Sequence, residues 1–370
     1  MTESIVHVLR FHAGYRCRHA GVCCTEDWPI PVEAPIYRRL AQALESSALR
    51  PGYVGATYFE PAHGLAAGEP VVTGRVGRDC AFFEPGRRLC AIHEQLGHDH
   101  LPSACQHFPR VVTIDPRGVF ISLSHVCPTD GRLLREPSVA PFDMVHDGPV
   151  VTPGLAWTGL DAREALPPQV SCDVLWDWDA LTVWERGILH QLEWLGAERA
   201  LSALKHAARQ LERWRPGGDI TLASFTESAL DAAGFEPGAR RIDIAALDGI
   251  ARQAATDDFS LHAAPFDRAA ADRELVEPAW EGQGPLVARY LAARTVANAV
   301  GYHAASARVW AASLDTAYAV LRMEAARQAA RADRVLDADL LVAAAAAADR
   351  LLVHRIDPAR LAASLAALPS

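Results

Sequence analysis

The chain has 370 residues, half of them hydrophobic and 22% charged, so it can bury a sizeable core in one large domain or two smaller ones. Its formal net charge of -9 and isoelectric point near 5.9 argue against a nucleic-acid-binding protein. No signal-peptide pattern opens the sequence, and the longest apolar run, Leu340–Ala348, is too short to cross a bilayer. We therefore expect a cytoplasmic protein that binds neither nucleic acid nor membrane.

Cysteine is unevenly distributed along the chain. Seven of the eight cysteines lie within the first 127 residues, at Cys17, Cys23, Cys24, Cys80, Cys90, Cys105 and Cys127. Segments rich in proline and glycine separate them, which is typical of a loop-rich fold held together by something other than long regular elements. A reducing cytoplasm, and the strain of bridging the adjacent pair, disfavour disulfides. Cys172 stands apart, and we expect it in the core.

One β-hairpin is predicted inside the cysteine-rich region. Residues 110–114 and 119–124 have the character of strands, and the segment DPRG at 115–118 has that of a turn. Antiparallel strands bring their outer ends together, so Cys105 before the hairpin and Cys127 after it should emerge at the same end.

The chain becomes helical from about residue 175. Apolar residues recur at helical spacing in 178–195, 200–214, 222–233, 242–254, 285–303, 305–332 and 337–354. We expect the tryptophans at 176, 178, 184, 194 and 214 to pack between helices. The predicted fold is α+β but mainly α. It has a loop-rich cysteine domain with a short β-hairpin over 1–147, a linker over 148–174 and a larger all-α domain over 175–370.

The seven clustered cysteines predict a metal or cluster site, with buried inert cysteines as the alternative. Thiolates are soft ligands that favour zinc or iron–sulfur clusters. The spacings C-x5-CC, C-x9-C-x14-C and C-x21-C lack the paired knuckles of structural zinc sites, so loop-borne ligands for an iron–sulfur cluster fit at least as well. The residues alone leave the metal open.

Other side chains near the cysteines are weaker candidates. A nitrogen ligand could come from one of the histidines at His93, His98, His100 and His107, although such residues are more often solvated. Arginines could neutralise an anionic cluster or hold a cofactor carboxylate, or simply be solvated, at Arg75, Arg78, Arg87, Arg88 and Arg110. We find no Walker A loop, nucleophile elbow or dinucleotide fingerprint, so the sequence identifies no catalytic residue.

The first cysteine segment, YRCRHAGVCC, resembles the opening of a cysteine-cluster family of zinc- or iron-chelating proteins, which runs aromatic-x-C-x-x-C-G-x-C-C. The matching residues are Tyr15, Cys17, Gly21, Cys23 and Cys24, with Ala20 at the family's second cysteine. The later segments are similar to a related group, the flagellin lysine N-methylases. Their pattern is matched by Trp28, Ile30, Cys80, Phe83, Leu89, Cys90, Ile92, Leu96, Gly97, Leu101, Cys105, Phe108, Pro109, Arg110, Ser122, Leu123, Cys127 and Pro128.

This resemblance covers roughly residues 10 to 135. It implies an iron–sulfur cluster of the four-iron type, with its ligands among the seven clustered cysteines, and methyl transfer from S-adenosylmethionine to an amine. The partner would be a protein lysine or a small-molecule amine, and Arg110 is the candidate cofactor-binding residue. Two other functions stay open: an iron–sulfur redox enzyme acting on a small molecule, and a non-enzymatic protein in which zinc or iron is structural.

Overall fold

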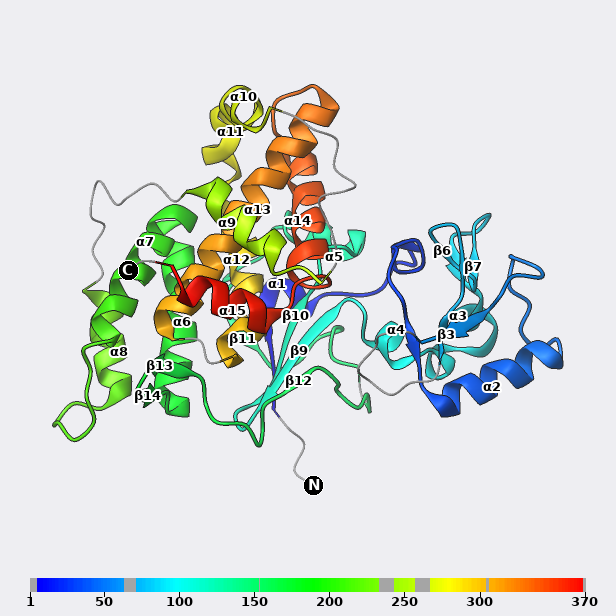
Figure 1. Cartoon of the computed structure of the whole chain (residues 1–370), viewed down its shortest axis with the longest axis horizontal. Helices are drawn as coiled ribbons and strands as arrows, with labels where there is room; N and C mark the ends of the chain where they lie inside the picture. The colour runs from blue at the N-terminus through cyan, green and yellow to red at the C-terminus, as the bar shows by residue number, and fades with distance from the viewer. Residues whose placement is uncertain are drawn as a thin grey trace. The chain divides into compact units, whose positions relative to one another are not determined.

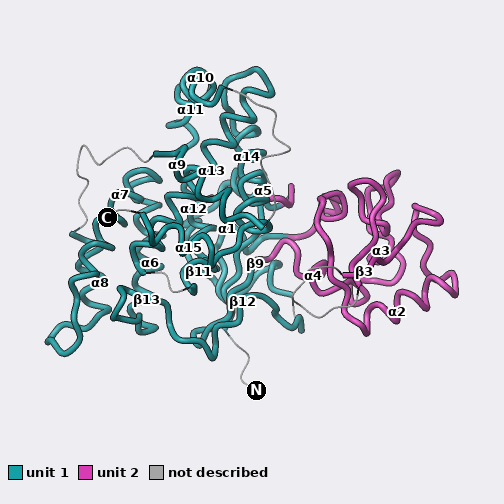
Figure 2. The backbone as a smooth tube through the Cα atoms, viewed as in Figure 1, with its two compact units in different colours: residues 1–15, 111–125, 130–370 teal, residues 16–110, 126–129 magenta. Residues whose placement is uncertain are grey.

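The computed structural model describes residues 5–62, 71–152, 154–232, 243–256, 267–303 and 306–368. The chain divides into two compact units, shown in Figure 2. Unit 1 comprises residues 1–15, 111–125 and 130–370, and unit 2 comprises residues 16–110 and 126–129. Helices predominate and the strands are short, which confirms the α+β, mainly α class. The two units differ from the predicted domains, because the N-terminal strand and most of the hairpin belong with the helices.

Unit 2 is built from short elements joined by loops (Figure 1). In chain order they are η1 Val22–Cys24, β2 Pro31–Val32, α2 Ala34–Glu45, β3 Phe59–Pro61, β4 Val71–Thr73, β5 Arg75–Val76, β6 Asp79–Cys80, β7 Phe83–Glu84, β8 Leu89–Cys90, α3 Ala91–Leu96, η2 His98–His100 and α4 Ser103–His107. Strands β2, β4 and β3 form one antiparallel sheet, and β5–β6 and β7–β8 form two-stranded ribbons.

The core of unit 2 forms around α2. Ile36 and Leu40 are four residues apart on one face of this helix, and both are buried. They pack with Phe82 and Ile92 in a cluster that also touches partly buried cysteines, Cys80, Cys90 and Cys105. Three of the predicted ligands therefore lie against the apolar core of this small unit.

Unit 1 contains a five-stranded sheet with the strand order β11-β1-β10-β9-β12. The strands are β1 Val6–Leu9, β9 Arg110–Asp115, β10 Gly118–Leu123, β11 Met144–Val145 and β12 Leu160–Asp161. Strands β9 and β10 are the predicted hairpin, which is confirmed. Strand β1 pairs in parallel with β10, with Val8 opposite Ile121. This pairing, which the sequence did not predict, joins the beginning of the chain to the hairpin.

Helices make up most of unit 1. They are α1 Arg10–Ala13, α5 Pro128–Leu133, α6 Trp178–Leu195, α7 Ala197–Leu211, α8 Leu222–Asp231, α9 Ile244–Gln253, α10 Arg268–Ala271, α11 Glu277–Trp280, α12 Gly284–Thr295, α13 Ala307–Ala332, α14 Ala338–Leu352 and α15 Pro358–Ala366. Short turns are the π-helical η4 Asp272–Val276 and the 3-10 turns η5 Glu281–Gln283 and η6 Ala299–Tyr302, and β13 Gln169–Ser171 pairs with β14 Val174–Leu175.

Helix α13 is the centre of the helical packing. It is buried on almost every side and contacts α7, α9, α12, α14 and α15, which surround it in Figure 1. Its alanine-rich sequence lets neighbouring helices approach closely. Polar N-caps fix several helix starts where the sequence predicted them, with the side chains of Asp177, Thr221, Ser306 and Asp337 each accepting a backbone hydrogen bond.

The predicted helices are largely confirmed, with one interruption. The helix expected over 285–303 ends at Thr295, because Val296 is extended and Ala297 has a φ of 57°. Residues 233, 242 and 305, at the ends of three predicted helices, lie outside the described residues. Among those described, no helix is both long and apolar enough to cross a membrane.

Two predictions about single residues are wrong. Cys172 was expected in the core but is exposed, because it occupies the turn between β13 and β14. Trp176 and Trp184 do stack in the interior, with ring centroids 5.8 Å apart, whereas Trp194, which was also expected to pack between helices, is 72% exposed.

The predicted linker over 148–174 contains β12, which is hydrogen-bonded to β9, and so this stretch includes part of the sheet.

A buried ion pair inside unit 1 should make stability depend on pH. Asp315 on α13 is 3% exposed and pairs with Lys205, the one lysine of the chain. Burial raises the pKa of Asp315 to about 6, although the positive charge of Lys205 acts to lower it. The folded chain therefore binds more protons than the unfolded chain between about pH 4 and pH 6, and this residue's contribution to stability falls as pH rises through that window.

We expect the free energy of unfolding of the wild type, relative to Asp315→Asn, to fall by about 3 kcal/mol between pH 3.5 and pH 7.5. Urea unfolding at a series of pH values measures this difference. The exposed Asp219 provides the control, since Asp219→Asn should unfold in parallel with the wild type at every pH. A constant difference between the wild type and Asp315→Asn would contradict the prediction.

Candidate metal centre and ligand pocket

Unit 2 brings five of the seven predicted cysteine ligands together. Cys23 and Cys24 come from η1, and their sulfur atoms are 3.9 Å apart. Cys80 ends β6, Cys90 ends β8, and Cys105 lies in α4. These side chains are near enough for electrostatic interaction. A thiolate at Cys90 would raise the pKa values of Cys24, Cys80 and Cys105, and one at Cys23 would raise that of Cys105. Segments that are far apart in the sequence thus deliver their thiols to one region.

The thiols differ in how easily they lose a proton. The Cys24 sulfur is hydrogen-bonded to that of Cys23 and interacts with that of Cys90, which raises the pKa of Cys24 and lowers those of its two partners, that of Cys90 to about 7. The backbone N–H groups at the start of α3 further lower the pKa of Cys90. Burial raises the pKa of Cys80 to about 11 and that of Cys105 well above its usual range. A soft metal would have to displace these protons on binding.

Two arginines hold the first cysteine loop in place. Arg75 donates to the carbonyl oxygens of Trp28 at 2.9 Å and Glu26 at 3.1 Å, just after Cys24. Arg88 donates to the carbonyl of Ala20 at 3.1 Å, before Cys23. Gly21 sits at φ 73° with no room for a side chain, because a Cβ atom would lie 2.8 Å from the carbonyl oxygen of Arg88. These contacts fix the backbone on both sides of the vicinal cysteines.

The other predicted candidates are spread over unit 2. Cys17 is exposed and accepts a hydrogen bond from the backbone N–H of His19 at 3.4 Å. Cys127 is buried in unit 2. Arg110 donates to the carbonyl of His107 at 3.5 Å, and the His107 ring donates to that of Ser103 at 2.9 Å. The other arginines predicted there include Arg87, paired with Glu94, and Arg78, whose carbonyl accepts from Arg75. His93 is half-buried beside His98, with ring centroids 6.0 Å apart.

A pocket of about 160 Å³ lies in unit 1, and the sequence did not predict it. It is lined by β1, β10, β11, α6 and α12, through residues that include His7, Phe120, His146, Glu185 and Thr295. The ring of His7 stacks on Phe120 with centroids 4.6 Å apart. The two strands that carry these rings are paired only in the folded sheet, with His7 opposite Phe120, so no local sequence pattern marks the pocket.

The charged groups that line this pocket are the carboxylate of Glu185 and the guanidinium groups of Arg117 and Arg186. Glu185 accepts from Arg117 at 2.7 Å, and burial raises its pKa. Burial also lowers the pKa of His7, so its ring is neutral near neutral pH. The Nε2–H of His7 donates to the carbonyl of Arg117 at 3.3 Å, which leaves Nδ1 as a proton acceptor. The pocket therefore combines an apolar wall, a neutral base and a carboxylate that is already paired with an arginine.

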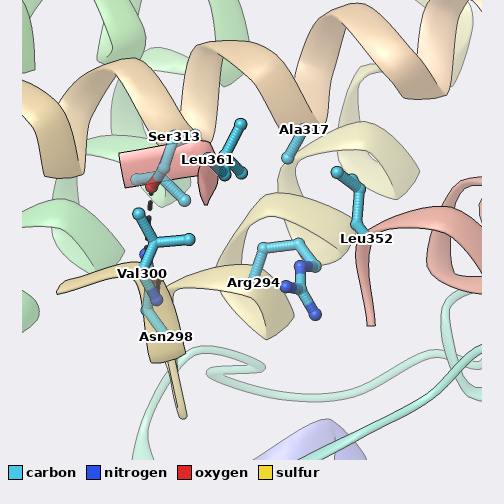
Figure 3. A pocket seen from close by; sticks show the side chains of 8 residues that line it. Arg294, Asn298, Val300, Ser313, Ala317, Leu352 and Leu361 are labelled. Carbon is cyan, nitrogen blue, oxygen red and sulfur yellow. Dashed lines mark hydrogen bonds between the residues drawn. The ribbon is translucent and has the colours of Figure 1, made fainter. Parts of the chain in front are cut away.

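A second, much smaller cavity of about 20 Å³ lies among helices α12, α13 and α14 (Figure 3). Arg294 lines it from the end of α12, Asn298 from the position before η6, Ser313 from α13, and Leu352 from the end of α14. Asn298 donates to the Ser313 hydroxyl at 3.2 Å. The volume is that of about one water molecule, so this cavity is too small for a substrate.

Comparison with known proteins does not place the chain. No protein-family model, no curated protein and no solved structure matches it.

Proposed function

We propose that this chain is an iron–sulfur protein whose cluster is held by cysteines of unit 2. The observation that carries the proposal is the meeting of five thiols, those of Cys23, Cys24, Cys80, Cys90 and Cys105, from four separate segments. Thiolates are the usual ligands of such clusters, and loops held by side-chain contacts are a common way of presenting them. When bound, the cluster would supply electron transfer or an iron atom to which a cofactor could bind.

The spacing of the sulfurs supports a cluster over a single zinc ion. Four thiolates at 2.3 Å around one tetrahedral zinc lie about 3.8 Å from one another. Cys23 and Cys24 have this separation, at 3.9 Å. Within the described part of the chain, however, no three cysteine sulfurs lie within 4.8 Å of one another. In a cluster of several irons each thiolate binds a different iron, so the sulfur atoms of the ligands can lie farther apart than around a single zinc ion.

For the activity, we propose methyl transfer from S-adenosylmethionine to an amine, on the strength of the resemblance to lysine N-methylases. A protonated amine is not nucleophilic, so an enzyme of this kind must first remove a proton. The unit 1 pocket has the groups for this step. Nδ1 of His7 would accept the proton, and Leu189 and Val296 would pack against the carbon chain of the amine.

Protein purified without oxygen should be brown and should contain iron and acid-labile sulfide in comparable amounts. Metal analysis, sulfide analysis and the visible spectrum test this expectation together. A colourless protein with stoichiometric zinc bound by thiolates and no sulfide would contradict it and would favour the structural-metal function.

The activity is tested separately, with cluster-loaded protein, labelled S-adenosylmethionine, and protein or small-molecule amines. We expect label in the amine only when the cluster is present. Calorimetry on the loaded protein tests cofactor binding alone. An intact cluster with no binding at millimolar S-adenosylmethionine would overturn the methylase proposal and leave the redox enzyme as the remaining function.

A further inference from the structure

A second set of metal-ligand side chains lies inside unit 1, and none of its members belongs to the cysteine unit. The parallel pairing of β1 with β10 places Val8 opposite Ile121. His12 and His125 each follow one of these paired residues by four positions, so both histidines lie beyond the carboxyl ends of neighbouring parallel strands. Ligand sites commonly occupy this position in sheets with parallel strands. Asp130 reaches the same place from α5.

The three side chains converge on a small volume. Nε2 of His12 lies 3.4 Å from Oδ1 of Asp130, and Nε2 of His125 lies 3.6 Å from Oδ2 of the same carboxylate. One ligand atom from each residue lies within 4.8 Å of the other two. All three side chains are 0% exposed.

Within the described residues, most polar atoms of this set lack a hydrogen-bond partner. These atoms are both oxygens of Asp130, both ring nitrogens of His12 and Nε2 of His125. Leaving buried polar groups unpaired is costly, and such groups are rare in native proteins without a ligand, ion or water to satisfy them.

We propose that His12, His125 and Asp130 bind a divalent transition-metal ion, with zinc as the best geometric fit. Zinc holds imidazole nitrogens and carboxylate oxygens at about 2.0–2.2 Å, so neighbouring ligands of a tetrahedral ion lie roughly 3.4 Å apart. The two nitrogen–oxygen separations, 3.4 and 3.6 Å, match this value. They are too long for good hydrogen bonds and longer than the roughly 3.0 Å of adjacent octahedral ligands.

Asp349 on α14 positions one of the ligands. Its Oδ2 accepts from Nδ1–H of His125 at 2.7 Å and from the backbone N–H of the same residue at 2.8 Å. This carboxylate–histidine contact turns Nε2 towards Asp130, as outer carboxylates do in histidine metal sites. The charges of Asp130 and Asp349 together would balance a divalent cation. The other charged side chain that acts on His125 and Asp349 is Arg294 on α12.

The ion would have a structural role. Its ligands are fully buried, and none of them lines either cavity of unit 1. Structural zinc sites are closed in this way, whereas catalytic sites keep an open position. The ion would join α1, the end of β10 and α5, and through Asp349 would connect them to α14. The proposal does not depend on the cluster in unit 2.

The test uses the full chain with two of its five clustered thiols replaced by the double substitution Cys90→Ser/Cys105→Ser, which should abolish cluster binding. This variant should still bind one equivalent of Zn²⁺ or Co²⁺, and the Co²⁺ complex should lack the sulfur-to-metal charge-transfer band of thiolate sites. Adding Asp130→Asn, which keeps the shape but weakens the ligand, should reduce the affinity at least tenfold and lower the melting temperature of the metal-loaded protein. The control is Asp315→Asn, which removes another buried carboxylate of unit 1 and should leave metal binding unchanged.

A folded double-cysteine variant that binds no Zn²⁺, Co²⁺ or Fe²⁺ would overturn the proposal. Unchanged affinity in the Asp130→Asn variant would do the same. If the cysteine substitutions prevent folding, anomalous diffraction from crystals of the wild-type protein at the zinc and iron edges decides the question. The proposal requires a peak between His12, His125 and Asp130, and the lack of a peak in metal-supplemented crystals would refute it.

Discussion

Serine at Cys90 or Cys105 is expected to abolish cluster binding. Both thiols lie against the core of unit 2 and interact electrostatically with each other. A hydroxyl is a much poorer ligand for soft metals than a thiolate. Affinity should fall at least about 100-fold, because even the outer partners of metal ligands are worth 10- to 100-fold. Iron, sulfide and visible absorbance per chain measure the loss, and the variants should also melt earlier because cluster binding is coupled to folding.

Cys172→Ser is the matched control, since this exposed cysteine lies in a turn of unit 1. It should keep the iron content and colour of the wild type. Cys17→Ser distinguishes the five-thiol group from the wider set of seven and should also retain the cluster. If Cys172→Ser bleached the protein as strongly as Cys105→Ser, the assignment of the cluster to unit 2 would be wrong.

Replacing Arg117 with methionine should destabilise unit 1 by about 3–5 kcal/mol, the usual effect of removing one partner from a buried ionic group. Arg117, in the turn between β9 and β10, donates to Asp115 and Glu185 at 2.7 Å each. Tyr302 donates a further 2.7 Å hydrogen bond to Asp115. Asp115 is 0% exposed and would lose its cationic partner. Urea unfolding followed by tryptophan fluorescence reports on unit 1, which contains eight of the nine tryptophans.

The chain contains a close control for this substitution. Asp161 and Arg163 repeat the Asp-x-Arg arrangement of Asp115 and Arg117. The Nε of Arg163 donates to the carboxylate of Asp161 at 2.9 Å, but both side chains are exposed. Arg163→Met should therefore leave the unfolding curve unchanged, because exposed ion pairs contribute little. Equal effects of the two substitutions would show that burial does not determine the strength of the Arg117 network. Arg117→Lys should restore only part of the stability, because lysine cannot donate to both carboxylates from a planar fork.

The sequence predicted those parts of the fold that depend on neighbouring residues. The hairpin of β9 and β10 follows from apolar residues on each side of an Asp-Pro-Arg-Gly turn. Helix α6 follows from its periodic apolar residues and ends before Gly196, at a φ of 73°. Strand β1 was not predicted because it has only four residues, and its partner is 113 positions away. No local pattern contains that information.

The candidate sites show the same limit. Cysteine is rare enough that seven in one region indicated a common purpose, and five of them do lie together. Histidine and aspartate are common at surfaces, so His12 and His125 carried no signal of their own. Their proximity depends on the register of β1 and β10, which pairing alone sets. Cys172 was misplaced because its burial depends on a two-residue turn between very short strands.

The position of unit 2 between β1 and the hairpin also affects the order of events during synthesis. Ribosomes add about 5–20 residues per second, so the 113 residues from Val8 to Ile121 take roughly 6–20 s to make. Throughout that time β1 has no partner strand, and the sheet of unit 1 cannot close. Cys17 to Cys105 all leave the ribosome before β10 does. The six cysteines from Cys17 to Cys105 are thus synthesised before the helical unit exists.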